Sequence, residues 1–494
     1  MHPILFRIPL PHTPLHLWWA LAAVAVIAIV FAVLAQRRGD RSGLLTSLVV
    51  ALAAGAAGWK WHTVAYEAAN VPIYAYGVML GVSLVIGWYL TLPLAERDGL
   101  PKETMANCYV ITALAALAGS RILYAITNPD EFKSFWDLFA LRNGGLVAYG
   151  GFIGGLLGSW AFLSPKKIRL LAWADEAVPS LASGLMVTRL GCYLFGCDFG
   201  KRLPDGAPHW LKTLGTFPHW VTGTLASGEG SPAYVRHLEV YRGTPLETEL
   251  VKMNSSFPVH PTQLYESLVG LGLLILLLTQ RRYLRFRGQV FFLFVFAYGF
   301  ARFLLELWRD DVERGSYGPT LDAHVYIPLC LLVMGLGFVF GISLGITNKR
   351  ARLVARILAF APPVIAYLAL KPASFGQTVP YQLSTSQLIG VLSALVVSFF
   401  YAAFWESARK TPRLALSLGD EDSIRELKGE TVEPRRAAQE DEDEDEEDDE
   451  EPEEKPAPAR TGKGKKKGLA PKAKVEESEP AGPEGEPEPE PGAS

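Results

Sequence analysis

Charged and polar residues stand at several points where long apolar stretches of this chain begin or end. Such side chains are costly inside a bilayer, so they usually face the interior of a helix bundle or a water-filled cavity. Three of them are the arginines Arg189, Arg302 and Arg309. A guanidinium suits a phosphate, because it donates forked hydrogen bonds to two oxygens. Glu306 follows Arg302 by four residues, so the two side chains share a helix face and can pair. We therefore expect an anion site at the level of the lipid headgroups.

Four clusters carry these residues and others of the same kind. They lie at 74–77, at 144–155, at 188–201, and at 260–266 together with 298–309. Each cluster also has a structural interpretation. Glycine runs let the backbone approach a ligand, but they equally let two helices pack closely. Pro261 suits the first turn of a helix, and an Arg–Glu pair on a span can be purely structural. The clusters alone leave these alternatives open.

Two of the four cysteines, Cys192 and Cys197, lie in the third cluster. Residues five apart on a regular helix point in different directions, so a disulfide requires the helix to end between them. The alternative is a pair of inert apolar thiols. The cysteine spacing lacks the paired C-x2-C pattern of a zinc site, and we expect no metal.

The elements that must position these clusters are membrane-spanning helices, because a run of about 20 apolar residues crosses the hydrocarbon core. The fold class expected is an all-α polytopic membrane protein. The stretch 15–35 is expected to be a retained first span, because no clear signal-peptide cleavage site follows it. The predicted spans are 15–35, 43–59, 74–94, 104–126, 145–163, 174–196, 262–280, 288–308, 324–346, 353–370 and 386–406.

Lysine and arginine clusters follow alternate spans, and all of them fall on one side of the membrane. The positive-inside rule makes that side the cytoplasm. The N-terminus is then outside, the C-terminal tail is inside, and all four polar clusters lie at outer ends. The one long outer connection, 197–261, is a candidate lid or headgroup-level loop. Because the basic residues sit at span ends, we expect no nucleic-acid partner.

The chain changes character beyond about Arg413. Residues 439–454 are almost entirely Glu and Asp, and a Pro- and Glu-rich stretch ends the sequence. Such a segment buries too little apolar area to offset the entropy of ordering, so a disordered tail without a catalytic role is expected. The overall net charge of −3 therefore averages two unlike regions.

Taken in order, spacing and membrane side, the clusters resemble the prolipoprotein diacylglyceryl transferases. The heptapeptide at 260–266 is close to that family's His-Pro-Ser-Gln-Leu-Tyr-Glu, and Arg189-Leu-Gly191 matches the start of its signature. Tyr298, Arg302 and Glu306 match its Tyr-Gly-x-x-Arg-x-x-x-Glu. Weaker matches lie at 1–6, 76–77, 119–124, 144–155 and 383–387.

The resemblance implies a seven-span transferase-like core with about four additional spans. The core is expected at 72–323, and its last span at 372–410. The additions are an N-terminal extension, 1–71, with two spans and an inserted pair of spans at 324–371. The disordered acidic and basic tail is expected at 411–494.

The resemblance also implies the reaction: diacylglyceryl moves from phosphatidylglycerol to the thiol of a prolipoprotein lipobox cysteine in the bacterial inner membrane, without a cofactor. Arg189 and Arg302 are expected to hold the phosphate, with Glu306 orienting Arg302. Tyr149 stands where the family usually has a histidine that has been considered as a base. The substrate-binding residues expected are Tyr76, Gly150, Gly151, Cys192, Gly200, His260, Gln263, Tyr265, Glu266 and Tyr298.

Two departures from the family leave other functions open. A tyrosine at 149 is a weaker base than a histidine unless a neighbouring arginine favours its charged form. The family's Gly-Asn-Phe-x-Asn-x-Glu is replaced here by 191–197. Two amides and a carboxylate are missing, because Cys192, Phe195 and Cys197 stand in their places, and Asp198 is a partial replacement for the carboxylate. The alternatives are a transferase with another acceptor and a non-catalytic phospholipid-binding or assembly protein. A transporter is disfavoured, because no inverted repeat is visible.

Overall fold

A computed structural model describes most of the first 430 residues. The chain divides into two compact units, Met1–Val432 and Glu433–Ser494, and all described residues belong to the first. The described ranges are 3–9, 15–37, 41–63, 65–66, 70–139, 144–220, 230–310, 315–372 and 378–430.

Helices form the body of the first unit, as predicted. Nine helical segments of the described residues are long and apolar enough to cross a membrane. The other two predicted spans fall on α2, whose apolar part is Ser47–Lys60, and on α5, which has 16 residues. The helices at the predicted spans are α1 (Leu17–Arg37), α2 (Arg41–Lys60), α3 (Ala75–Arg97), α4 (Lys102–Thr127), α5 (Ala148–Leu163), α6 (Leu170–Phe195), α10 (Thr262–Gln280), α11 (Gln289–Glu306), α12 (Ala323–Phe340), α13 (Lys349–Leu358), α14 (Ala361–Leu370) and α15 (Thr385–Lys410).

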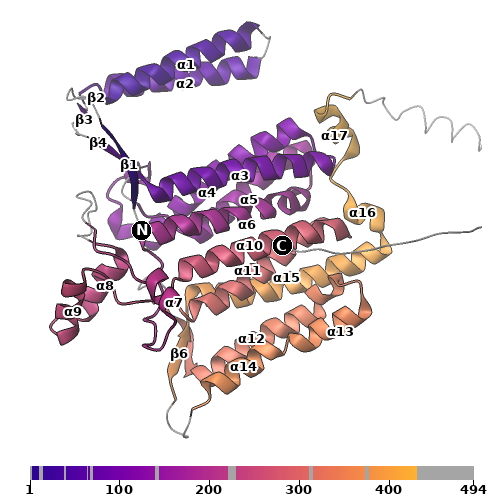
Figure 1. Cartoon of the computed structure of the whole chain (residues 1–494). Coiled ribbons are helices and arrows are strands. Elements are labelled where there is room, and N and C mark those ends of the chain that lie inside the picture. The colour runs from indigo at the N-terminus through magenta and orange to yellow at the C-terminus, as the bar shows by residue number, and fades with distance from the viewer. Residues whose placement is uncertain are drawn as a thin grey trace, which may run out of the picture. The chain divides into compact units, whose positions relative to one another are not determined.

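The core helices pack on one another in a continuous series. Helix α5 packs on α4, α3 on α6, α6 on α10, α10 on α11, and α11 on α15 (Figure 1). Helix α12 packs on α15 and α14, while α1 packs mainly on α2. Apolar side chains of α11, α12 and α15 form one continuous core, which includes the buried Phe303, Met334 and Tyr401. The last span is therefore bound directly to the helix that carries Arg302.

The described residues also form three small antiparallel sheets, which were not predicted. Strand β1 (Ile4–Pro9) pairs with β4 (Asn70–Tyr74), β2 (Leu15–His16) with β3 (Ala65–Tyr66), and β5 (Tyr317–Asp322) with β6 (Pro380–Leu383). The first two sheets join the chain before α1 to the chain after α2. Helices α1 and α2 thus lie in the chain between strands that pair with each other, and β4 leads directly into α3.

The predicted span 353–370 is confirmed, because it lies within Lys349–Leu370, one of the nine segments long and apolar enough to cross a membrane. A break divides this segment into α13 and α14, because Pro362 and Pro363 stand at the start of α14 and favour a new first turn. One boundary needs correction. The predicted tail starts too early. Residues after 410 form α16 (Pro412–Leu416) and α17 (Glu421–Leu427), and Ile424 is buried in a cluster with Trp173 and Met105. The rest of the predicted tail, 431–494, lies outside the described residues.

An ion network joins the loops at the end of the bundle where α3, α10 and α17 finish. Arg281 lies 2.6 Å from Glu176 and 3.1 Å from Asp98, and Arg287 lies 2.6 Å from Asp98. The neighbouring Asp175 accepts hydrogen bonds from the backbone N–H groups of Gly288 (2.7 Å) and Phe291 (2.9 Å), which caps the start of α11. A cavity of about 640 Å³ lies at this end, lined by Lys167, Arg169 and Arg287 among others. These contacts hold together one end of the helices. The polar clusters lie at the opposite end of the same helices.

Candidate active site

The buried carboxylate of Glu266 is the centre of the polar cluster. Its side chain comes from the first turns of α10 and is 3% exposed. Arg189 Nε, from the end of α6, lies 3.0 Å from Glu266 Oε2, and Arg302 Nη1, from α11, lies 3.4 Å from the same oxygen. The Tyr298 hydroxyl donates to Oε1 at 3.4 Å. Three helices therefore place two arginines and a phenol on one carboxylate.

Arg302 also contacts its own helix and α15. Its Nη2 lies 3.1 Å from Glu306 Oε2, which confirms the predicted pair, and donates to the Ser386 hydroxyl at 3.3 Å. The start of α15 is held by a capping box between Ser384 and Gln387. Ser386 thus sits on a well-defined helix end and fixes the second guanidinium nitrogen.

Asp198 forms a second ionic contact directly after α6. It lies 2.6 Å from Arg189 Nη1 and 2.5 Å from Arg309 Nη2. Helix α6 ends at Gly196, whose φ of 86° is left-handed, and Asp198 itself has a φ of 56°. These two residues turn the chain back toward the helix. Burial favours a raised pKa for Asp198, but the charges of Arg189 and Arg309 outweigh it and hold that pKa at about 2. Asp198 is therefore an anion at neutral pH.

The cluster is not a bare patch of positive charge, as the arginines alone had suggested. Arg189, Arg302 and Arg309 are matched by Asp198, Glu266 and Glu306. Buried arginines need such partners, because an unpaired charge in a low-dielectric site is expensive. An anionic ligand must use the remaining guanidinium N–H groups, and Arg189 Nη2 has no hydrogen bond among the described residues.

Two further tyrosines lie beside this cluster. Tyr76, at the start of α3, lies against the end of α6: a Cβ at Gly191 would be 3.1 Å from Tyr76 Cα. Tyr76 also interacts electrostatically with Arg189, and Tyr149 does so with Tyr298. The structure thus brings Tyr76, Tyr149 and Tyr298 to the same end of the bundle.

Arg121 positions the segment that leads to Tyr149. Its guanidinium donates to the carbonyl oxygens of Asp137 (2.8 Å), Leu138 (3.2 Å) and Gly145 (3.0 Å), and also to that of Gly144. Its side chain is buried in α4. Arg121 lies in the stretch 119–124, which resembles the family's Gly-x-Arg-x-x-Tyr. The sequence did not predict that its guanidinium would donate several hydrogen bonds to one loop.

Some residues at 260–266 belong to the polar cluster, as Glu266 does, and others contact the segments around it. Gln263 is fully buried; its Nε2 donates to the carbonyl oxygen of Cys197, whereas its Oε1 has no partner among the described residues. His260 Nδ1 lies 3.2 Å from the Tyr265 hydroxyl. Burial and then the charge of Lys201 lower the pKa of His260, so its imidazole is neutral at neutral pH.

The glycines that sequence reasoning placed at the substrate have packing roles in the structure. A Cβ at Gly150 would lie 2.3 Å from the Gly119 carbonyl oxygen, and one at Gly151 would lie 2.7 Å from Ser120 Oγ, so both glycines let α5 touch α4. A Cβ at Gly200 would lie 2.6 Å from the Trp308 carbonyl oxygen. These contacts support close helix packing, which the sequence had left open as an alternative. Substrate binding by the three glycines stays a prediction.

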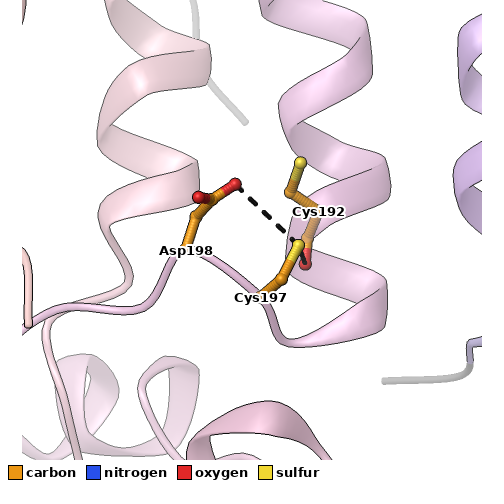
Figure 2. Close-up of side chains that lie close together, drawn as sticks. All are labelled: Cys192, Cys197 and Asp198. Carbon is orange, nitrogen blue, oxygen red and sulfur yellow. Dashed lines mark hydrogen bonds between the residues drawn. The ribbon is translucent and has the colours of Figure 1, made fainter. Parts of the chain in front are cut away.

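Cys192 lies at the edge of the cluster, with its Sγ 3.8 Å from Arg189 Nη1. It faces Cys197 and Asp198 across the turn that ends α6 (Figure 2). The two Sγ atoms and a carboxylate oxygen of Asp198 all lie within 4.8 Å of one another. Such a group can hold a metal ion, but here the carboxylate already accepts from two arginines.

Three residues of this arrangement, Asp198, Arg309 and Ser386, were not among the site residues expected from the sequence. Asp198 and Arg309 were considered individually, but their ion pair joins segments 111 residues apart. Ser386 lay in a motif noted only for its resemblance. The signal available was their common position at span ends on one side of the membrane.

Comparisons with known proteins identify the family of this chain. The family model for prolipoprotein diacylglyceryl transferase matches residues 63–343, more than half of the chain. The chain is 26% identical over 282 residues to a phosphatidylglycerol–prolipoprotein diacylglyceryl transferase of Clostridium tetani, covering 57% of this chain and 97% of that protein. It is 28% identical over 275 residues to transferase 2 of Clostridium perfringens, covering 55% and 91%. A Psychrobacter arcticus transferase is 29% identical over 272 residues, covering 52% and 84%.

The matched range includes the helices that carry Arg189, Glu266 and Arg302, but it ends before α15. It also runs through α12, so the proposed division into core and inserted spans stays a prediction. With its apolar helices, the chain is a multi-pass protein of the bacterial inner membrane and a transferase. It belongs to the prolipoprotein diacylglyceryl transferase family.

Proposed function

We propose that this chain transfers diacylglyceryl from phosphatidylglycerol to the lipobox cysteine of prolipoproteins, with Arg189 and Arg302 as the phosphate-binding pair. The observation that carries the assignment of these residues is their convergence on the buried Glu266. A shared carboxylate holds both guanidinium groups in place before the ligand arrives, and such preorganised donors stabilise charge that develops during a reaction.

The bond changes set the requirements for the site. The lipobox sulfur forms a bond to the terminal glyceryl carbon, the bond from that carbon to the phosphate oxygen breaks, and glycerol phosphate leaves. The leaving phosphate gains negative charge, which Arg189 and Arg302 would stabilise. Glu306, 3.1 Å from Arg302, orients that arginine. The sulfur must lose its proton, and Tyr149, near Tyr298, is the proposed relay: its phenol oxygen takes the thiol proton as its own proton passes to water.

Gln263 supplies a proposed contact to the polar part of the donor lipid. Its buried Oε1 lacks a hydrogen-bond partner among the described residues, and a buried acceptor without a partner costs about 1–3 kcal/mol. A glyceryl hydroxyl group would satisfy it. Tyr76 and Tyr298 are the other proposed contacts to headgroup oxygens, with the polar ends of the helices facing outward.

Complementation tests this function. The full chain is expressed in a bacterium whose own diacylglyceryl transferase can be switched off, and prolipoprotein processing is followed by gel shift. We expect rescue by the wild type and none by Arg302→Ala. Arg409→Ala is the matched control, because Arg409 is exposed on the same helix as Ser386 and pairs with an exposed glutamate, Glu406. A membrane-inserted, folded wild type that does not rescue would contradict the proposed reaction for that host's substrates and favour a lipid-binding role or another acceptor.

A further inference from the structure

The turn after α6 brings two thiols together that the helix itself would hold apart. Gly196 ends the helix in a left-handed conformation, and its N–H donates to the Cys192 carbonyl oxygen at 2.8 Å. The Cys197 thiol lies 3.8 Å from that same oxygen. The condition that the sequence set for a disulfide, a helix that ends between the two cysteines, is therefore met (Figure 2).

We infer that Cys192 and Cys197 form a disulfide that joins the last turn of α6 to the loop carrying Asp198. This inference rests on the proposed function for one point only: the proposed orientation places both thiols on the outer side of the inner membrane. That compartment is oxidising, and disulfides form and persist there.

The surrounding charges favour a disulfide over a metal site. Asp198, the third potential ligand, is held by Arg189 at 2.6 Å and by Arg309 at 2.5 Å. A cation at the two sulfurs would have to displace these guanidinium groups and lie beside their positive charges. Joining the two sulfurs, which removes two protons and two electrons, needs no such displacement.

The oxidation is a two-electron exchange with an oxidised dithiol–disulfide oxidoreductase. Cys197 is partly exposed and Cys192 is buried, so the mixed disulfide forms at Cys197. The Cys192 sulfur, 3.8 Å from the Arg189 guanidinium that favours its thiolate, then attacks the Cys197 sulfur. The oxidoreductase leaves as a dithiol, and its two sulfurs take up the two protons that Cys192 and Cys197 lose.

The consequence is local. A disulfide constrains the unfolded chain less when it closes a short loop, and here the cysteines are five residues apart. It would instead hold Asp198 where it pairs with Arg189 and Arg309. It would also hold the Cys197 carbonyl that accepts from Gln263.

Differential alkylation of the full chain tests this inference. Membranes of expressing cells are quenched with acid and denatured, free thiols are labelled, and the protein is reduced and labelled with a second reagent before peptide mass analysis. We expect Cys192 and Cys197 to take only the second label. All four cysteines are free thiols in the structure, and Cys108 and Cys330, which are buried on α4 and α12, are the internal controls that take the first label.

Cys197→Ser provides the matched variant, in which Cys192 should change to the first label. Labelling of all four cysteines by the first reagent in the wild type would overturn the inference. Processing activity is measured on the same membranes. Free thiols in an active protein contradict the disulfide alone, whereas a disulfide in an inactive protein contradicts the proposed function alone.

Discussion

Glu266 explains why two buried arginines can lie side by side in this membrane protein. Each guanidinium is repelled by the other, and each would be costly to bury alone. The shared carboxylate, together with Asp198 and Glu306, balances their charges and leaves the remaining N–H groups for a ligand. At the residue scale, the site depends on a carboxylate that need not touch the substrate.

Replacing Glu266 with glutamine should therefore impair activity while keeping the size of the side chain. We expect the initial rate of prolipoprotein processing to fall about 30-fold or more, equivalent to about 2 kcal/mol, because breaking a buried charge pair leaves its partners uncompensated. Rates are measured in proteoliposomes that contain phosphatidylglycerol and a lipobox peptide. Glu239→Gln, which affects an exposed pair with Arg236, is the control. A Glu266→Gln rate equal to that of the control would contradict the central role of Glu266.

At the element scale, the start of α11 is capped by the Asp175 side chain of α6. Replacing Asp175 with alanine removes both acceptors of the Gly288 and Phe291 N–H groups. Buried donors without partners cost about 1–3 kcal/mol, so we expect a lower free energy of unfolding and a lower Tm in detergent. Asp322→Ala is the matched control, because Asp322 stands at the start of α12 without a side-chain cap. Equal stability of the two variants would show that the cap is not needed.

The segment containing α8 (Pro232–Val240) should loosen in mild acid. Burial, followed by the charges of Arg202 and Arg236, lowers the pKa of His237 from 6.5 to about 4. The neutral imidazole accepts from the Phe257 N–H at 3.1 Å. Because the unfolded state binds the proton more readily, this contribution to stability is present above pH 6.5 and is lost as the pH falls toward 4. The full loss is about 3 kcal/mol.

Hydrogen exchange of 230–261 measures this effect. We expect exchange to increase between pH 6.5 and 4, after correction for the intrinsic rate. His237→Gln should abolish that increase, whereas His209→Gln, at an exposed position, should keep it. An increase that persists in His237→Gln would assign the transition to another group.

The elements were predictable because hydropathy is a local property, whereas the contacts that complete the site are not. The position of Glu306 one turn after Arg302 predicted their ion pair, and the structure confirms it. The meeting of Arg189 with Glu266, and of Arg309 with Asp198, depends on helix packing that no single segment encodes. The break between α13 and α14 was not predicted, because the hydropathy of 349–370 is continuous across it. The small sheets depend on pairing between segments about 60 residues apart, as in β1 and β4.

At the scale of the whole molecule, the folded part continues past the last span. Ile424 of α17 is buried with Trp173 of α6 and Met105 of α4, and the Arg169 N–H donates to the Leu418 carbonyl oxygen at 2.8 Å. The segment after α15 therefore closes the end of the bundle that carries the Asp98 network, and the first compact unit ends only at Val432.

Two truncations separate this closing segment from the acidic tail. A chain ending at 432 should keep the Tm and processing rate of the full protein, because all contacts of the first unit remain. A chain ending at 410 loses α16 and α17 and should unfold at lower temperature. Ile424→Ala in the full chain should reproduce part of that loss, about 2–5 kcal/mol for a large buried apolar side chain. Thermal unfolding in detergent compares the three. Equal stability of the chains ending at 432 and at 410 would show that the packing of Ile424 does not contribute to the fold. A chain ending at 432 that is less stable than the full protein would show that the tail belongs to the folded unit.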